Sequence, residues 1–263
     1  MKLVGSRVEL AQARLDLPGR VAVVMTMGAL HDGHAALIGA AGDLADNVIV
    51  TVFVNPLQFG ADEDLDRYPR TLEADVALCK AAGTDLVFTP TAQVVYPTEP
   101  VVRVSAGALG QVFEGATRRG HFDGVLTVVL KLLHLIRPDV AVFGQKDAQQ
   151  LAAIRRMVDD LDVGVTVVAV PTVREADGLA LSSRNRYLST EERSRAVGLS
   201  EALATGDVVA GRALLDAAMI DTDYLERVDS STFEVQPDGD LLVVAGTLGS
   251  TRLIDNRLLR KDT

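Results

Sequence analysis

Cysteine and long apolar runs are scarce in this chain, and each of these two shortages excludes a class of protein. Among 263 residues there is one cysteine and no tryptophan, and aromatic residues make up 4%. The single cysteine, Cys79, cannot form an intramolecular disulfide, which fits a reducing compartment. The longest nearly apolar run, Val125 to Ile136, has 12 residues, whereas a membrane-spanning helix needs about 20. The first residues lack the apolar stretch of a signal peptide, so we expect a cytoplasmic protein.

Positive charge is also in short supply. Lysine and arginine number 26 against 36 aspartate and glutamate residues, which gives a formal net charge of -10. Nucleic acids and anionic membranes attract proteins through a positive surface field, so neither is an expected partner. An anionic small molecule would therefore need a local positive potential. Hydrophobic residues make up 48% of the chain, which is enough for one large domain or two unequal ones.

Apolar strands alternate with amphipathic helices over most of the chain. The predicted strands are residues 21–25, 47–54, 85–88, 139–143 and 165–170, and the predicted helices are 35–45, 72–82, 125–136 and 147–161. This alternation is typical of an α/β fold with a Rossmann-like, doubly wound parallel sheet. Residues 89–123, rich in proline and glycine, show no clear pattern.

The pattern changes at Pro171. Ser189 and Glu192 form a capping box for one helix, a second helix is predicted over residues 207–219, and short strands follow near residues 223–228, 241–245 and 251–255. We therefore predict an α/β domain over residues 1–175 and a second, smaller α+β domain over residues 176–263.

Two histidines lie where the first predicted strand gives way to the first helix, in the stretch Thr26-Met27-Gly28-Ala29-Leu30-His31-Asp32-Gly33-His34. Backbone N–H groups at a helix start are unpaired and the helix dipole is positive there, so this junction is expected to bind an anion. Gly33 permits a close approach of the backbone, and histidines three residues apart share one side of a helix. Imidazole groups donate to phosphate oxygens.

Two familiar phosphate signatures are missing. Neither the G-x-x-x-x-G-K-[ST] loop nor a G-x-G-x-x-G turn follows the first strand, which excludes P-loop kinases and the usual dinucleotide dehydrogenases. An alternative interpretation is that the histidine pair is half of a metal site, which would need His121 or His134 as a third ligand, but phosphate binding is the favoured one. The acidic residues Asp62, Glu63, Asp64 and Asp66 are a further metal candidate, although a solvated loop is the favoured interpretation. Cys79 shares a helical face with Leu72 and Val76, which favours a buried thiol over a nucleophile.

Six ordered blocks of sequence lie between residues 26 and 188. They are Thr26–His34, FVNPLQFG at 53–60, YPRT at 68–71, HFDGVLTVV at 121–129, FGQKDAQQ at 143–150 and PTVREADGLALSSRNRYL at 171–188. Together they resemble the pantothenate synthetase, or pantoate–β-alanine ligase, family. The His-x-Gly-His motif alone would indicate only the wider nucleotidyltransferase superfamily.

The resemblance implies a reaction that uses ATP and Mg²⁺ to activate pantoate as pantoyl adenylate, with release of pyrophosphate. The β-alanine amine then attacks and AMP leaves. Because the substrate carboxylate attacks the α-phosphate, no protein nucleophile is needed, which fits the lack of a serine or cysteine triad signature. A homodimer is also implied. The helix predicted over residues 125–136 carries Thr127, Lys131 and His134 on one stripe, which fits either a core helix or a subunit interface.

The site residues are carried over position by position. His34, His31, Lys146 and Arg184 are the implied catalytic residues. The implied ATP-binding residues are Thr26, Met27, Gly28, Ala29, Leu30, His31, Asp32, Gly33, His34, Gly144, Gln145, Lys146, Asp147, Val173, Leu181, Ser182, Ser183 and Arg184. The implied residues for pantoate and β-alanine are Gln58, Gln150, Met27 and Asn55. The metal ligands stay unassigned.

The chain departs modestly from the family pattern. Met25 stands where proline is common, Asp32 and Gln145 where glutamate is common, and Ala148 where an aromatic residue is frequent. Two alternatives stay open: another adenylyltransferase with the His-x-Gly-His motif, and a nucleotide-binding regulator without catalysis. Pyrophosphate exchange driven by an amino acid or a mononucleotide would favour the first, and ATP binding without AMP formation would favour the second.

Overall fold

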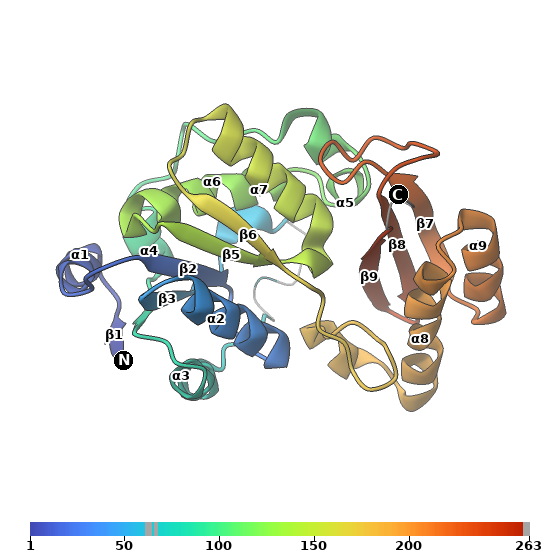
Figure 1. Cartoon of the computed structure of the whole chain (residues 1–263), viewed down its shortest axis with the longest axis horizontal. Coiled ribbons are helices and arrows are strands. Elements are labelled where there is room, and N and C mark those ends of the chain that lie inside the picture. The colour runs from blue at the N-terminus through green and yellow to red at the C-terminus, as the bar shows by residue number, and fades with distance from the viewer. Residues whose placement is uncertain (61–64, 66–67, 260–263) are drawn as a thin grey trace. The chain divides into compact units, whose positions relative to one another are not determined.

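The structure, a computed structural model, describes residues 1–60, 65 and 68–259. The chain forms two compact units (Figure 1). The first consists of Met1–Phe143 and Ala153–Val170, and the second of Gly144–Ala152 and Pro171–Thr263. The second unit therefore takes in a short segment from the middle of the strand–helix part of the chain.

A six-stranded sheet forms the centre of the first unit, in the order β1-β4-β3-β2-β5-β6. The strands are β1 Lys2–Val4, β2 Val21–Thr26, β3 Asn47–Val52, β4 Leu86–Phe88, β5 Val140–Gly144 and β6 Thr166–Val170. Adjacent strands from β1 to β5 pair in parallel. The doubly wound α/β prediction is confirmed, and each of the five predicted strands is present. Strand β1 is not among the predicted strands, because three residues are too few to show a period.

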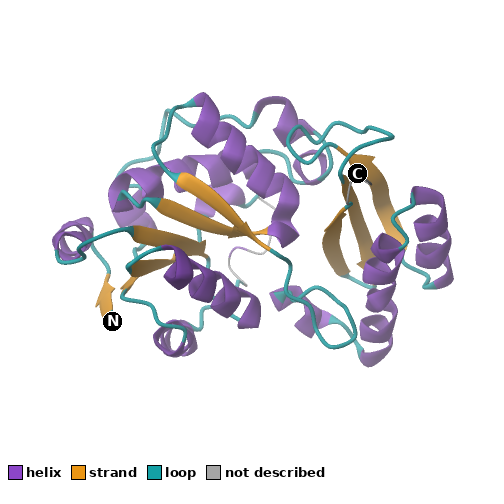
Figure 2. Cartoon of the chain, in the orientation of Figure 1, coloured by secondary structure: helices purple, strands orange, loops and turns teal. Residues whose placement is uncertain are grey.

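Helices cover both faces of this sheet (Figures 1 and 2), with α2 and α3 on one side and α6 and α7 on the other. The helices are α1 Arg7–Leu15, α2 Asp32–Leu44, α3 Leu72–Ala81, α4 Ala92–Val95, α5 Glu114–Thr117, α6 His121–Ile136 and α7 Ala148–Asp160. Short 3-10 turns are η1 Pro56–Gln58, η3 Gly107–Gln111 and η4 Gln145–Asp147. Helix α2 begins three residues earlier than predicted, so His34 lies inside its first turn.

The direction of winding reverses at β2. From β2 the chain proceeds to β3 and β4 on one side, and it returns later to β5 and β6 on the other. Parallel sheets bind ligands at the carboxyl ends of the strands at such a reversal. Strand β2 ends at Thr26, so the histidine-bearing stretch leaves the sheet at this point.

Helix α6 supplies much of the core. Eleven of its 16 residues are buried in the single chain. Of the predicted polar stripe, Thr127 is buried and accepts a hydrogen bond from the Val104 N–H at 3.0 Å, whereas His134 is exposed. The helix therefore fits the buried-core interpretation within one chain.

Cys79 is fully buried on α3. Burial raises the pKa of its thiol to about 11. Because only the thiolate is a good nucleophile, the thiol is inert near neutral pH, as the helical face predicts.

The second unit holds a three-stranded antiparallel sheet in the order β7-β8-β9. Its elements are the turn η5 Ser183–Tyr187, the helices α8 Thr190–Ala204 and α9 Val208–Ala217, and the strands β7 Asp221–Val228, β8 Leu241–Leu248 and β9 Thr251–Leu258. The capping box of Ser189 and Glu192 is present at the start of α8, as predicted. Leu199 and Leu203 of α8 pack with Leu225, Leu242 and Val244 into one core.

None of the helices in the described part of the chain has both the length and the apolar character needed to cross a bilayer. The acidic segment Asp62, Glu63, Asp64 and Asp66 lies outside the described residues.

Candidate active site

The two histidines of the first unit cap helix α2 reciprocally. His31 is the N-cap residue, and its Nδ1 accepts a hydrogen bond from the Gly33 N–H at 3.2 Å. His34, three residues on, accepts from the His31 N–H through its own Nδ1 at 3.2 Å. The ring centroids lie 4.2 Å apart. Two backbone donors that a helix start leaves unpaired are thus satisfied by imidazole rather than by the usual hydroxyl or carboxylate.

This capping defines the protonation pattern of the two rings. A ring nitrogen that accepts from an N–H carries no hydrogen, so Nδ1 of both His31 and His34 is the bare nitrogen. The hydrogen of each neutral ring is therefore on Nε2. In this tautomer Nε2–H is the donor atom of each imidazole, at the positive end of a helix dipole, and such a donor suits a phosphate group.

Gly33 is required by the histidines themselves. A Cβ at this position would lie 2.9 Å from Cε1 of His31 and 3.0 Å from its Nδ1. Any side chain would displace the capping ring. The glycine of the His-x-Gly-His motif therefore permits the cap to form, in addition to the close ligand approach that the sequence predicts.

A buried carboxylate, Asp75 of α3, supports the same stretch. It accepts hydrogen bonds from the N–H groups of Leu30 at 2.8 Å and Ala29 at 3.2 Å, and from the Thr71 hydroxyl at 3.2 Å. Ala29 has φ of +51°, in the left-handed region that costs a residue with a Cβ about 1–2 kcal/mol. Asp75, with 2% exposure, stabilises this strained turn just before the histidines.

The predicted substrate residues of the first unit also lie together. The Asn55 side-chain amide donates to Gln58 Oε1 at 3.1 Å and to the Gly124 carbonyl at 3.1 Å. Gln58 directs its own amide nitrogen to the sulfur of Met27 at 3.1 Å. Met27 belongs to the histidine-bearing stretch, so one continuous set of contacts joins the predicted ATP and pantoate residues of this unit.

The close approach of α6 holds this set in place. A Cβ on Gly124 would lie 2.2 Å from the Leu57 carbonyl oxygen, so only glycine allows the helix to reach η1. The Tyr96 hydroxyl donates to Asn55 Oδ1 at 3.0 Å, and Lys131 lies 5.4 Å above the Tyr96 ring. Burial raises the pKa of Tyr96 and lowers that of Lys131. Tyr96 therefore stays a neutral donor that orients Asn55.

His121 has a structural role that the sequence did not reveal. Its Nδ1 lies 2.8 Å from the Gln58 carbonyl oxygen, and Nε2 lies 3.0 Å from Arg118 Nη1. An arginine can only donate, so Nε2 accepts and Nδ1–H donates to Gln58. His121 is committed to this backbone contact. Across the described residues, no group of three or more His, Cys, Asp or Glu is placed to hold a metal, which removes the metal half-site interpretation there.

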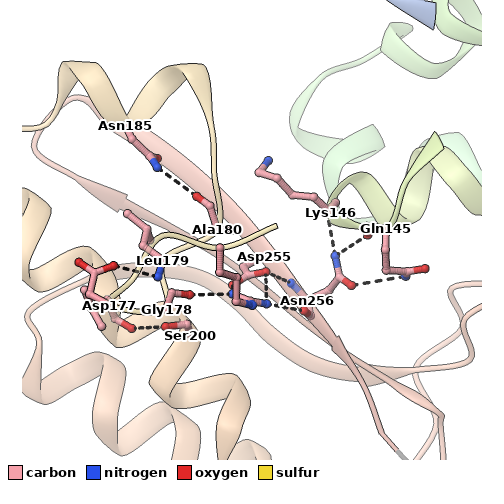
Figure 3. Close-up of polar contacts among 12 residues, drawn as sticks. Gln145, Lys146, Asp177, Gly178, Leu179, Ala180, Asn185, Ser200, Asp255 and Asn256 are labelled. Carbon is pink, nitrogen blue, oxygen red and sulfur yellow. Dashed lines mark hydrogen bonds and ion pairs between the residues drawn. The ribbon is translucent and has the colours of Figure 1, made fainter. Parts of the chain in front are cut away.

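In the second unit, the turn that carries Lys146 is attached to strand β9 (Figure 3). The Asn256 side-chain amide donates to the carbonyl oxygens of Gln145 at 2.9 Å and Lys146 at 2.8 Å. Lys146 extends its side chain away from Asn256, and its ammonium group lies 3.9 Å from Asp147. The backbone of the turn is therefore fixed, and the half-buried Lys146 side chain ends in an ion pair with Asp147.

A second segment of this unit, residues 173–184, forms a short hairpin followed by η5. The Leu181 N–H donates to the Val173 carbonyl at 2.9 Å and closes the hairpin. Ser182 caps η5 by accepting from the Arg184 N–H at 3.2 Å, which leaves its hydroxyl hydrogen to donate elsewhere. The Arg184 side chain is exposed, and Ser183 is half-buried.

Ion pairs hold this hairpin to the rest of the second unit. Arg174 makes a two-pronged contact with the buried Asp255, at 2.6 and 3.0 Å. Arg193 of α8 contacts Glu175 at 2.7 Å and Asp177 at 2.8 Å. Arg193 holds the pKa of each of these carboxyls below its ordinary value.

The predicted residues thus fall into one set per unit. Thr26 to His34, Asn55 and Gln58 form the set of the first unit, and the second unit holds the rest: Gly144, Gln145, Lys146, Asp147, Gln150, Val173, Leu181, Ser182, Ser183 and Arg184. Gln150 is half-buried in the first turn of α7. The departures Gln145 and Ala148 leave the turn intact, because Asn256 binds its backbone and Ala148 is buried.

Comparison with known proteins shows which family has this sequence and fold. The family model described as pantoate-beta-alanine ligase matches residues 4–258. The chain belongs to the pantoate–β-alanine ligase family. It is similar to the pantothenate synthetase of Acidothermus cellulolyticus, with 54% identity in an alignment 272 positions long that covers 96% of this chain and 90% of that protein.

Solved structures of the family agree with the fold. Pantothenate synthetase from Thermus thermophilus has a TM-score of 0.92 and 45% identity, covering 99% of this chain and 100% of that one. The ligase from Francisella tularensis, solved in complex with β-γ ATP and β-alanine, has a TM-score of 0.87 and 31% identity, covering 98% of this chain and 97% of that one. As a member of this family, the chain is an enzyme that forms a carbon–nitrogen bond.

Proposed function

We propose that this enzyme joins pantoate to β-alanine at the expense of ATP, through a pantoyl-adenylate intermediate. The observation that carries the proposal is the pair of capping histidines at the start of α2, in a chain that the family model matches over residues 4–258. A carboxylate of pantoate attacks the α-phosphorus and pyrophosphate leaves. The β-alanine amine then attacks the acyl carbon and AMP leaves.

The chain's own residues supply donors and positioning in this chemistry. The Nε2–H groups of His31 and His34 donate to phosphate oxygens, where negative charge builds in the transition state. Lys146 adds a point charge and Arg184 a planar fork, and both act on the same ATP. Ser182 and Ser183 add hydroxyl donors. The remaining residues of Thr26 to His34, Gly144 to Asp147, Val173 and Leu181 bind the nucleotide.

Pantoate is bound by amide side chains in this proposal. An amide both donates and accepts, which suits the hydroxyl and carboxylate groups of a small hydroxy acid. Gln58 and Gln150 provide these contacts, and Asn55 orients Gln58 through its bond to Oε1. Met27, in contact with Gln58, adds an apolar wall for the pantoate methyl groups.

Mg²⁺ enters this proposal as a partner of the nucleotide. The start of α2 carries two imidazoles whose Nδ1 atoms accept from the backbone, which leaves Nε2–H as the donor of each ring and suits phosphate better than a hard cation. The ion would then be held mainly by phosphate oxygens and water, and it would offset phosphate charge. We further propose a homodimer, a cytoplasmic location and a lid role for residues 176–263.

The test is an assay with ATP, Mg²⁺, pantoate and β-alanine that measures pantothenate and AMP. We expect the two products in equal amounts, together with pantoate-dependent exchange between ATP and pyrophosphate when β-alanine is omitted. Exchange driven by an amino acid or a mononucleotide, with none from pantoate, would assign the chain to another adenylyltransferase. ATP binding in calorimetry with no AMP formed would indicate a regulator.

A further inference from the structure

Two neighbouring polar residues of β9, Asp255 and Asn256, are buried to 3% and 4% exposure. Buried polar side chains are costly unless they are hydrogen-bonded, so their partners show what they are for. These partners lie outside β9. Asn256 binds the turn that carries Lys146 (Figure 3). Asp255 binds Arg174, at the start of the hairpin that leads to Arg184.

The Asn256 amide is fully used on the Lys146 turn. Its two N–H hydrogens go to two successive carbonyls, those of Gln145 and Lys146, at 2.9 and 2.8 Å. The Gln145 side chain returns a long contact to Asn256 Oδ1 at 3.5 Å. A single buried amide therefore fixes two consecutive peptide groups of η4, and with them the origin of the Lys146 side chain.

The Asp255 carboxylate holds the other segment in the same way. The Arg174 guanidinium donates to both carboxylate oxygens of Asp255, and it also donates to the Gly178 carbonyl at 3.0 Å, inside the hairpin. Arg174 further reaches the Asn256 carbonyl at 3.3 Å, and the Asn256 N–H donates to Asp255 Oδ1 at 2.7 Å. The two anchors are therefore linked through the backbone N–H and carbonyl of Asn256.

We propose that Asp255 and Asn256 are positioning residues that hold the Lys146 turn and the 173–184 segment in one fixed arrangement within the second unit. Through them Lys146 and Arg184 approach the phosphates of ATP as a pair. The inference rests on the proposed function, because it assigns both side chains to phosphate binding. Catalytic groups act well only when supporting contacts hold them to a fraction of an ångström.

The test compares Asn256→Ala and Asn256→Asp with Leu253→Ala. Asn256→Asp keeps the size of the side chain but directs carboxylate oxygens at two carbonyls. Leu253 lies in the same strand and is buried in the core of this unit. Its apolar side chain cannot form a hydrogen bond to a predicted site residue, so its truncation controls for lost stability. Each variant is assayed for pantoate-dependent ATP–pyrophosphate exchange at a temperature at which all are folded.

Both Asn256 variants are expected to lower the exchange rate about 10- to 100-fold, with the KM for pantoate little changed. Leu253→Ala should retain a near-native rate per folded molecule. The decisive measurement is a double-mutant cycle with Lys146→Ala. If Asn256 acts through Lys146, adding Asn256→Ala to Lys146→Ala changes the rate less than about twofold, whereas independent roles give multiplied losses.

The outcomes separate this inference from the proposed function. A near-native Lys146→Ala enzyme would overturn the role of Lys146 and the inference that depends on it. A slow Lys146→Ala enzyme with near-native Asn256 variants would overturn the inference alone, as would multiplied losses in the cycle. Failure of both Asn256 variants to unfold cooperatively would also overturn it, because the residue would then serve folding. A slow Asp255→Asn enzyme with normal pantoate KM would extend support to the second anchor.

Discussion

His34 accepts a hydrogen bond from the backbone N–H of His31 through Nδ1, at 3.2 Å. One imidazole therefore has two separate duties at its two nitrogens. Nδ1 caps helix α2, whereas Nε2–H is the donor that we assign to phosphate. Substitutions that imitate one nitrogen at a time can separate the stability of the helix from the chemistry.

The first prediction uses this separation. Glutamine at position 34 brings an amide nitrogen near the place of Nε2, and asparagine brings an amide oxygen near the place of Nδ1. His34→Ala should lower pantoate-dependent ATP–pyrophosphate exchange by about 10²- to 10³-fold. His34→Gln should retain more of the rate than His34→Asn, and His34→Asn should retain more of the stability, with a cap worth about 1 kcal/mol.

The matched control for this series is His134→Ala, since His134 is exposed on α6. It should leave both the rate and the thermal unfolding curve near native. A His34→Ala enzyme with native turnover would contradict the phosphate role of this ring, whatever its effect on stability.

The second prediction concerns Asp75. Asp75→Asn replaces one carboxylate oxygen with an amide that faces an N–H of Ala29 or Leu30, and a buried unsatisfied donor costs about 1–3 kcal/mol. We expect that loss in free energy of unfolding from a urea titration, together with a reduced exchange rate because the stretch before His31 is no longer held. Asp43→Asn, on the exposed face of α2, is the control. Unchanged stability would contradict the anchoring role.

Four contacts of the site show where prediction from the sequence succeeds and where it fails. The histidine cap and the Asn55–Gln58 contact are local, so the spacing of residues along the chain is enough to predict that each pair lies together. Asp75 acts on Leu30, 45 residues away, and Asn256 acts on Lys146, 110 residues away. Their targets are backbone groups, which leave no mark in the sequence. The one signal in the sequence that could have pointed to them is a polar residue at a core position of an otherwise apolar helix or strand.

The third prediction is a pH dependence that involves Arg193. The pKa values of Glu175 and Asp177 lie below 4.5 and 3.8 respectively because Arg193 contacts both carboxyls. A carboxyl with a lowered folded pKa adds stability that is present above the unfolded pKa and is lost as pH falls through the folded pKa. Arg193→Gln should therefore be less stable than the native chain near pH 6, by the small amount that such exposed pairs contribute.

The difference between the two proteins should shrink toward zero as pH falls through the lowered pKa values of the two carboxyls, when both gain protons. Urea unfolding of both proteins near pH 6 and at an acidic pH below those values measures it. Arg156→Gln, which removes an exposed pair with Asp160 on α7, controls for a general loss of surface charge. A stability difference that is the same at both pH values would contradict the ion-pair account of how the hairpin is held.

The last prediction separates the two substrates. Gln58 and Gln150 are assigned to pantoate and contribute nothing to the triphosphate, so their removal should affect one substrate only. Gln58→Ala and Gln150→Ala should each raise the KM for pantoate about tenfold, the effect of one lost hydrogen bond, while the KM for ATP changes less than about twofold. Gln12→Ala, on the exposed face of α1, is the matched control and should change neither constant.

Because Gln58 is also hydrogen-bonded to Asn55, Asn55→Ala should reproduce the Gln58 effect in weaker form. Equal increases for pantoate and ATP in the glutamine variants would instead mean that these residues support the fold of the site as a whole, and the substrate assignment would then be wrong.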